Sequence, residues 1–141
     1  MGGHVSFEIP AELEQIQNVS EKIEQSMKTH GWGEDAVLDV QLAVEEAVTN
    51  SILHGYDGTS GTIAIRIETT PHYITVEIAD NAPAFDPLSV PDPDIDADLE
   101  DRQIGGLGIF LIRRVMDEVS YRYEKEKNIL VMVKDRNQKE S

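Results

Sequence analysis

The segment LDVQLAVEEAVTNSILH, residues 38–54, constrains the fold most, because it joins an apolar helical stripe to a row of polar groups. Valines at positions 37, 40, 44 and 48 recur at helical spacing, which predicts a helix that packs into a core. We expect this helix to begin near residues 34–35 and to end at Gly55. The neighbouring face, at about 100° of rotation per residue, carries Ala43, Glu46, Ala47, Asn50 and His54. Because alanine is small, this face leaves room for a bulky ligand against the helix.

A length of 141 residues suits one domain, and we expect a single domain over residues 1–141 with a frayed tail at 135–141. The composition, 40% hydrophobic and 28% charged, is typical of a globular protein, and no apolar run approaches the roughly 18 residues of a membrane-spanning helix. The amino-terminal sequence MGGHVSFEIP lacks the pattern of a secretory signal, so we expect a cytoplasmic protein that does not contact a membrane. The absence of cysteine excludes disulfides, thiolate metal sites and a cysteine nucleophile.

The formal net charge of -15 predicts that the protein does not bind nucleic acid directly, because this charge repels phosphate backbones. A basic protein partner would suit the charge. Solubility alone explains the acidity equally well, so the charge does not decide between the two interpretations.

The remaining elements follow from the periodicity of the apolar residues. Alternation predicts strands at residues 5–9, 62–68, 73–80, 119–123 and 129–134, the last two joined as a hairpin. Helical spacing predicts further helices over residues 11–30 and 104–116. Residues 81–104, rich in proline and aspartate, predict a long loop that is either a functional lid or a disordered segment.

Asp80 ends the strand YITVEIAD, whose period of two places it on the same face as Ile74, Val76 and Ile78. A carboxylate in an inward apolar row is costly unless a partner donates hydrogen bonds to it or accepts its charge. We therefore expect Asp80 to have a dedicated partner. The alternative is that Asp80 only caps a turn through the backbone of Ala82.

A cluster of glycines opens the segment IGGLGIFLIRRVM, residues 104–116. Gly105, Gly106 and Gly108 would let a ligand approach the backbone closely, and the free amides of a helix amino terminus favour bound phosphate. A flexible hinge is the alternative interpretation of these glycines.

The order of these features, helix E-x-x-x-N, strand-end Asp and G-x-G opening a helix, resembles the N, G1 and G2 boxes of the GHKL ATPase superfamily. Type II topoisomerases and histidine kinases share that ATP-binding fold. The strings EAVTNSILHGY, DNAPAFDP and GGLGIFLIRRVMDEVSY are most similar to those of the small anti-sigma-factor serine kinases, RsbW-like and SpoIIAB-like, and the resemblance covers nearly the whole chain.

The resemblance implies a two-layer α/β (α+β) sandwich, in which three helices cover one face of a mixed, mostly antiparallel sheet. It also implies a regulatory serine/threonine protein kinase that binds ATP and Mg²⁺. Such a kinase would phosphorylate a serine on a small anti-sigma-factor antagonist and would sequester a sigma factor in alternation. A homodimer is expected from the resemblance alone.

The family roles carry over to matching positions of this sequence. Glu46 would be the general base for a serine hydroxyl or a water, Asn50 would coordinate Mg²⁺, and Asp80 would accept a hydrogen bond from the exocyclic amine of adenine. Residues 87–104 would form the lid, in which the arginine could neutralise phosphate charge or could simply be solvated. The cofactor-binding residues would be Asn50, Asp80, Ala82, Ala84, Arg102, Gly105, Gly106, Leu107 and Gly108.

Two departures from the family pattern stand out. Ala82 and Ala84, with Pro83 between them, replace glycines that often follow the aspartate of the G1 box. The last strand, ILVMV, has no threonine hydroxyl near the adenine, so a bound water or a backbone group would have to substitute.

Three further interpretations stay open. Glu46 and Asn50, four residues apart on a helix, could be a hydrogen-bonded surface pair. The protein could instead be an ATP-dependent protein-binding switch that transfers no phosphate. It could also be a plain interaction domain in which all three motifs are structural.

Overall fold

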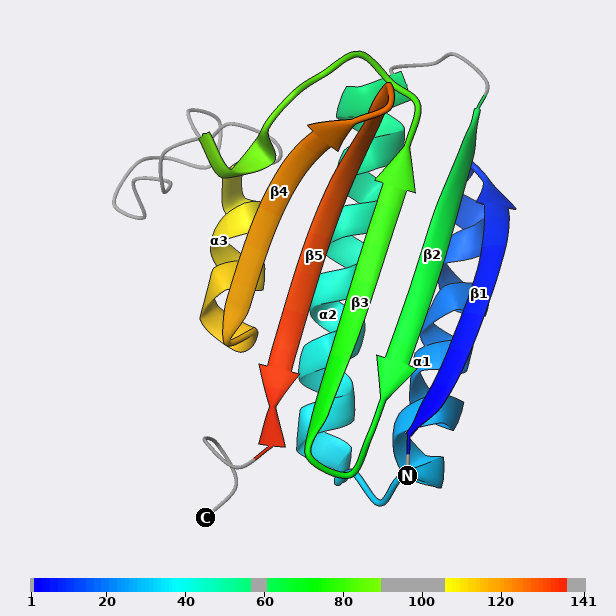
Figure 1. Ribbon diagram of the computed structural model, residues 1–141, viewed down its shortest axis with the longest axis vertical. Helices are drawn as coiled ribbons and strands as arrows, with labels where there is room; N and C mark the ends of the chain where they lie inside the picture. Colours follow the sequence, from blue (N-terminus) through cyan, green and yellow to red (C-terminus); the bar gives the residue numbers. More distant parts are fainter. Residues whose placement is uncertain (1, 57–60, 90–105, 137–141) are drawn as a thin grey trace.

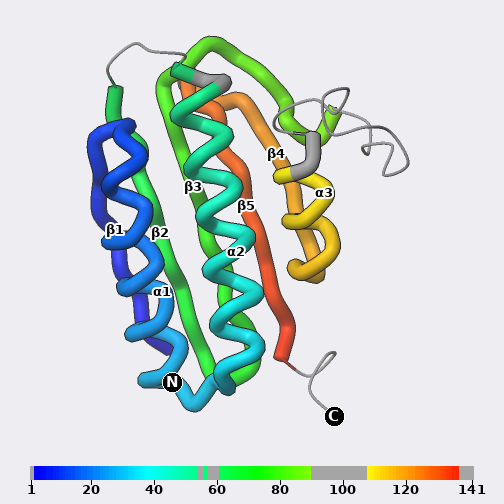
Figure 2. Tube along the Cα trace, turned by 180° about the vertical axis from the view of Figure 1, so that it is seen from behind, coloured from blue at the N-terminus to red at the C-terminus, as the bar shows by residue number. Residues whose placement is uncertain are grey.

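The computed structural model describes residues 2–56, 61–89 and 106–136. They form two layers, a five-stranded sheet and a layer of helices on one of its faces (Figure 1). Seen from behind, α1, α2 and α3 run side by side over that face (Figure 2). The predicted two-layer α+β sandwich is confirmed.

The sheet contains β1 (Gly3–Pro10), β2 (Thr62–Thr69), β3 (Tyr73–Asp80), β4 (Glu118–Glu124) and β5 (Lys127–Asp135). Their order in the sheet is β1-β2-β3-β5-β4, so β5 lies between its hairpin partner β4 and the strand β3. Each neighbouring pair is antiparallel. The described strands therefore form an antiparallel sheet rather than the mixed one that we expected.

The helices are α1 (Ile16–Thr29), α2 (Glu34–Asn50) and α3 (Gly106–Val115). Two boundaries differ from the prediction. The helix expected from residue 11 begins only after a short 3₁₀ turn, η1 (Leu13–Gln15), because the amide of Ala11 still donates to the carbonyl of Gly61 and keeps the chain beside β2. In addition, α2 continues as a π-helical turn, η2 (Ser51–Tyr56), instead of remaining an α-helix to residue 55.

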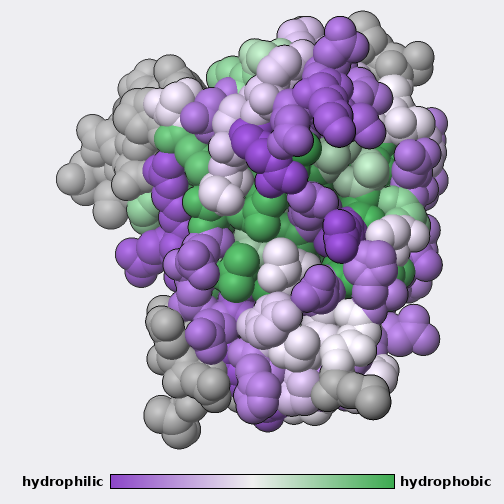
Figure 3. Space-filling model, in the orientation of Figure 1, coloured by the Kyte–Doolittle hydropathy of each residue, from purple (hydrophilic) through white to green (hydrophobic). Residues whose placement is uncertain are grey.

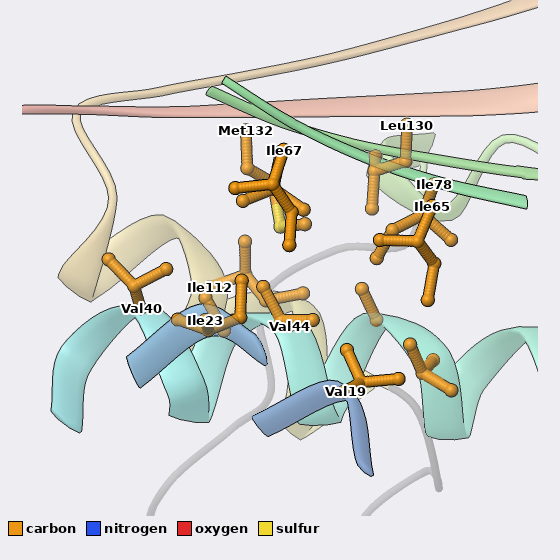
Figure 4. Close-up of a cluster of buried hydrophobic side chains, with 14 of the residues drawn as sticks. Val19, Ile23, Val40, Val44, Ile65, Ile67, Ile78, Ile112, Leu130 and Met132 are labelled. Carbon is orange, nitrogen blue, oxygen red and sulfur yellow. The ribbon is translucent and has the colours of Figure 1, made fainter. Parts of the chain in front are cut away.

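The core lies between the helices and the inward rows of the sheet. The four valines of α2 at positions 37, 40, 44 and 48 are fully buried, as predicted. Figure 4 shows Val40 and Val44 below the sheet residues Ile67 and Met132, with Ile112 of α3 beside them. Burial of a side chain of this size stabilises the fold by roughly 1.5–3 kcal/mol.

None of the described helices covers the opposite face of the sheet, and apolar side chains gather near the centre of that face (Figure 3). Ile129, Val131 and Val133 of β5 are partly exposed there, because Leu130 and Met132 between them point into the core. Among the described helices, none has both the length and the apolarity that crossing a bilayer would require.

Candidate functional site

A pocket lies where the end of α2 meets the carboxyl end of β3 and the amino end of β5. Apolar side chains of Ala47, Ile78 and Leu130 form part of its wall, and Phe85 contributes an aromatic ring that is 47% exposed. The polar side chains that line it are Asn50, Ser51, Asp80, Tyr121 and Asn128. Its free volume of about 40 Å³ holds only a few water molecules, and the pocket is open to solvent, so a larger ligand would extend out through its mouth.

The carboxylate of Asp80 is buried in this pocket, with an exposed fraction of 9%. Its Oδ2 accepts a hydrogen bond from Ser51 Oγ at 2.5 Å, and its Oδ1 accepts from Asn128 Nδ2 at 2.9 Å. The backbone amide of Ala82 also donates to Oδ1, at 3.1 Å. The expected dedicated partners are therefore present, and the turn-capping bond to Ala82 exists beside them.

Asn128 is the residue of β5 that lies directly opposite Asp80 in the sheet. The two hydrogens of its Nδ2 are shared among three acceptors, Asp80 Oδ1 and the carbonyls of Ala82 and Pro83, and its Oδ1 accepts from Phe85 N at 3.0 Å. Tyr121 Oη also donates to Oδ1, at 2.5 Å. The side chain of Asn128 thus holds the turn that lacks glycines through three of its backbone groups.

Three polar residues of this network, Ser51, Tyr121 and Asn128, were not predicted as site residues. Asn128 could have been found, because it continues the inward row of Leu130 and Met132, as Asp80 does on β3. Ser51 could not, because its direction depends on the π-helical turn that follows α2.

Glu46 lies one helical turn before Asn50 on α2 and faces the first turn of α3. A Cβ added at Gly108 would come within 2.9 Å of Glu46 Oε2, so the carboxylate occupies the space that a side chain at Gly108 would fill. Burial raises the pKa of Glu46, and the nearby negative charge of Glu45 raises it further. A partly desolvated carboxylate beside the amino terminus of a helix suits a general base close to a phosphate site.

Glu46 and Asn50, both of which the structure describes, form no hydrogen bond with each other. The interpretation of a hydrogen-bonded surface pair is therefore not supported. The amide of Asn50 lines the pocket and has no side-chain partner among the described residues, so both its oxygen and its nitrogen are available to a ligand.

The other predicted positions divide into two groups. Ala82 is buried in the turn after β3 and Ala84 is exposed there, and Gly106, Leu107 and Gly108 form the first turn of α3. Arg102, Gly105 and most of the predicted lid lie outside the described residues; its described part, residues 87–89, is a 3₁₀ turn, η3 (Pro87–Ser89).

The sequence matches a protein family described as the histidine kinase-like ATPase domain, over residues 9–134. It is 30% identical to the serine-protein kinase RsbW of Listeria monocytogenes over 145 aligned positions. This alignment covers 99% of this chain and 92% of the relative. The sequence is 35% identical to the anti-sigma F factor of Clostridium botulinum over 101 aligned positions, and this alignment covers 71% of each chain.

Two solved structures share the fold at low sequence identity. The RsbU and RsbW domains of a Mycobacterium tuberculosis protein match with a TM-score of 0.64 and 11% identity, over 94% of this chain and 32% of that one. The histidine kinase domain of an Erythrobacter litoralis blue-light activated kinase matches with a TM-score of 0.54 and 16% identity, over 92% of this chain and 63% of that one.

Proposed function

Because this chain belongs to the histidine kinase-like ATPase family, we propose that it is an ATP-dependent serine/threonine protein kinase and anti-sigma factor. Its protein substrate is a serine on a small anti-sigma-factor antagonist, and its second partner is a sigma factor. One observation carries the proposal: the Glu46 carboxylate, with its raised pKa, lies against Gly108 one helical turn away from the pocket that holds Asn50 and Asp80.

The pocket is the site for the adenine of ATP. Three donors already occupy the carboxylate of Asp80, two on Oδ1 and one on Oδ2. Since an ionised carboxylate offers about four lone-pair sites, one position on Oδ2 remains for the exocyclic amine of the base. The apolar wall around Ala47, Ile78 and Leu130 packs against the faces of the ring.

The triphosphate then runs along α2 from the pocket toward Glu46 and the first turn of α3. The amides of Gly106, Leu107 and Gly108 are the first of that helix, so they have no partner within the helix and would donate to a phosphate at its amino terminus. The unpaired oxygen of Asn50 fits Mg²⁺, which prefers oxygen ligands and substrate phosphates. When bound, Mg²⁺ supplies positive charge that neutralises the phosphate oxygens.

Glu46 takes the proton in the transfer step. The serine hydroxyl of the antagonist donates a hydrogen bond to the Glu46 carboxylate, which orients the oxygen toward the γ-phosphorus. As the new oxygen–phosphorus bond forms and the bond to ADP breaks, the hydroxyl proton moves to Glu46. Because burial raises the pKa of Glu46, this carboxylate is a stronger base than a solvated glutamate.

The proposal includes a homodimer as the working form. Sedimentation equilibrium tests this part separately, and we expect a mass of twice the 15.7 kDa of one chain. A mass of one chain at micromolar concentration would contradict the dimer without touching the assignment of the ATP site.

A second candidate function is an ATP-dependent binding switch without phosphate transfer. The surroundings of Glu46 favour the kinase, because a protein that only binds ATP needs no carboxylate of raised pKa beside the phosphates.

The test measures both transfer and binding for Glu46→Gln, with radiolabelled ATP, a candidate antagonist protein and equilibrium dialysis. We expect the transfer rate to fall about a hundredfold or more while the Kd for ATP changes less than about threefold. Glu45→Gln, the same change at the adjacent position, is the matched control and should keep transfer within about tenfold. Normal transfer by Glu46→Gln would refute the assignment of the base, and ATP binding without transfer in the unaltered protein would favour the switch.

A further inference from the structure

We propose that Asn128 is a positioning residue for base recognition, which fixes the Asp80 carboxylate so that its one free lone pair faces the 6-amino group of a purine. This inference rests on the proposed function, because it takes the pocket to be the site of the adenine.

The position of Asn128 is fixed by the sheet and by its burial. It is the cross-strand partner of Asp80, and its exposed fraction is 9%. The hairpin before it turns through Lys125 and Glu126, both with positive φ, and so sets the residue at which β5 begins. The register of β3 and β5 therefore places Asn128 opposite Asp80, whichever rotamer its side chain adopts.

The orientation of the Asn128 amide is also determined. The carbonyls of Ala82 and Pro83 can only accept hydrogen bonds, so the nitrogen of the amide has to face them. The backbone N–H of Phe85 can only donate, so it has to meet the oxygen. The same orientation directs Nδ2 to Asp80 Oδ1 at 2.9 Å, and it lets Tyr121 Oη donate to Oδ1 at 2.5 Å.

Two consequences for Asp80 follow from this geometry. The bond from Asn128 occupies Oδ1 together with the amide of Ala82, so the remaining acceptor position lies on Oδ2 beside the bond from Ser51. The carboxylate is also held at both oxygens, and rotation about its last bond would break hydrogen bonds in a buried site. A ligand therefore meets an acceptor of fixed direction.

The same side chain shapes the turn that forms the pocket wall. Residues 82–85 contain no glycine, and Asn128 supplies hydrogen bonds to three backbone groups of this turn, at Ala82, Pro83 and Phe85. Removal of its amide leaves those groups without these partners and frees the turn to move. Asp80 and the wall above it would then change position together.

A comparison of two purine triphosphates, with and without an amino group at C6, measures the hydrogen bond from the base to Asp80. A 6-amino purine donates to the free position on Asp80, whereas purine riboside triphosphate, which carries only hydrogen at C6, makes no such bond. A hydrogen bond to a charged acceptor corresponds to about a tenfold to hundredfold preference for ATP. The ratio of the two Kd values is independent of the fraction of protein that is folded, because that fraction scales both values equally.

The experiment measures the Kd of ATP and of purine riboside triphosphate by calorimetry. We expect the unaltered protein to prefer ATP at least about tenfold. Asn128→Ala should reduce this preference below about threefold, while Asn18→Ala, the same change on the exposed face of α1, should keep it. Circular dichroism shows whether each variant is folded.

If Asn128→Ala does not fold, a second variant tests the same inference. Tyr121→Phe removes one of the two donors to Asn128 Oδ1, the closer one, and leaves the N–H of Phe85 in place; it should lower the preference for ATP at least about threefold. Full preference in a folded Asn128→Ala protein, or in Tyr121→Phe where the first variant is unfolded, would overturn the inference. An unaltered protein that binds both triphosphates equally well would also overturn it while leaving ATP binding intact. An unaltered protein that binds neither would overturn the proposed function, and this inference with it.

Discussion

At Gly108, the absence of a side chain decides where the Glu46 carboxylate can lie. Gly108→Ala would place a Cβ 2.9 Å from Glu46 Oε2, and the end of the flexible glutamate has to shift to relieve the contact. We predict that the variant stays folded, because alanine is a better helix former than glycine, and that its transfer rate falls about tenfold because the base is displaced. Steady-state kinetics and thermal denaturation check the two parts. An unchanged transfer rate would contradict the placement of Glu46 at the reacting group.

The raised pKa of Glu46 predicts the pH dependence of transfer. Only the ionised carboxylate accepts the proton, so the rate should rise with pH through the raised pKa of Glu46, at a pH above the usual value for glutamate. The negative charge of Glu45 is the second cause of the raised pKa of Glu46, after burial. Glu45→Gln removes this charge and should move the midpoint of the profile of kcat against pH to lower pH. A midpoint that stays in place, or moves to higher pH, would exclude Glu46 as the group that titrates.

The direction of a side chain was predictable where the backbone period alone sets it. The inward direction of Asp80 was predicted because β3 alternates strictly, and the same reasoning applied to β5 would have predicted the inward direction of Asn128. The contact between Glu46 and Gly108 could not be inferred in this way, because it depends on how closely α2 packs against α3.

At the scale of the elements, the strands and the apolar stripe of α2 followed from the sequence because long, regular patterns dominate local exceptions. The exceptions are segments whose conformation is set by tertiary contacts. The π-helical turn after Asn50 widens the helix just before Tyr56, whose hydroxyl donates to the carbonyl of Thr62 and accepts from the amide of Asn81. That turn brings Ser51 to Asp80, and no periodicity indicates it.

The β4–β5 hairpin carries a prediction about stability. Its two turn residues, Lys125 and Glu126, have φ values of 53° and 64°, a conformation that favours asparagine and glycine. The double variant Lys125→Asn, Glu126→Gly should raise the free energy of unfolding by about 1 kcal/mol in a urea titration. Glu8→Gly, which puts glycine at an exposed strand position, should lower it instead. A loss of stability in the double variant would contradict the turn geometry.

At the scale of the whole molecule, the net charge of -15 has a measurable effect on the folded state. Charges of one sign repel each other, and salt screens them over a Debye length of about 10 Å at 0.1 M. We predict that the Tm rises between about 10 mM and 200 mM sodium chloride, and that potassium chloride acts alike because ionic strength alone matters. A Tm that falls or stays constant would show that local ion pairs outweigh the overall repulsion.

Four elements, α2, β3, β5 and the start of α3, supply the residues of the proposed ATP site: Asn50 and Asp80 line the pocket, and Glu46 lies next to Gly108 one helical turn away. We propose that a single magnesium nucleotide contacts all four residues. A crystal structure with Mg²⁺ and a non-hydrolysable ATP analogue tests this proposal.

In that complex we predict the 6-amino nitrogen of adenine at about 3 Å from Asp80 Oδ2 and the metal at about 2.1 Å from the Asn50 oxygen. The γ-phosphate should lie between Glu46 and the first amides of α3. A nucleotide bound elsewhere on the molecule, or bound here with Asp80 or Glu46 turned away from it, would contradict the proposed ATP site.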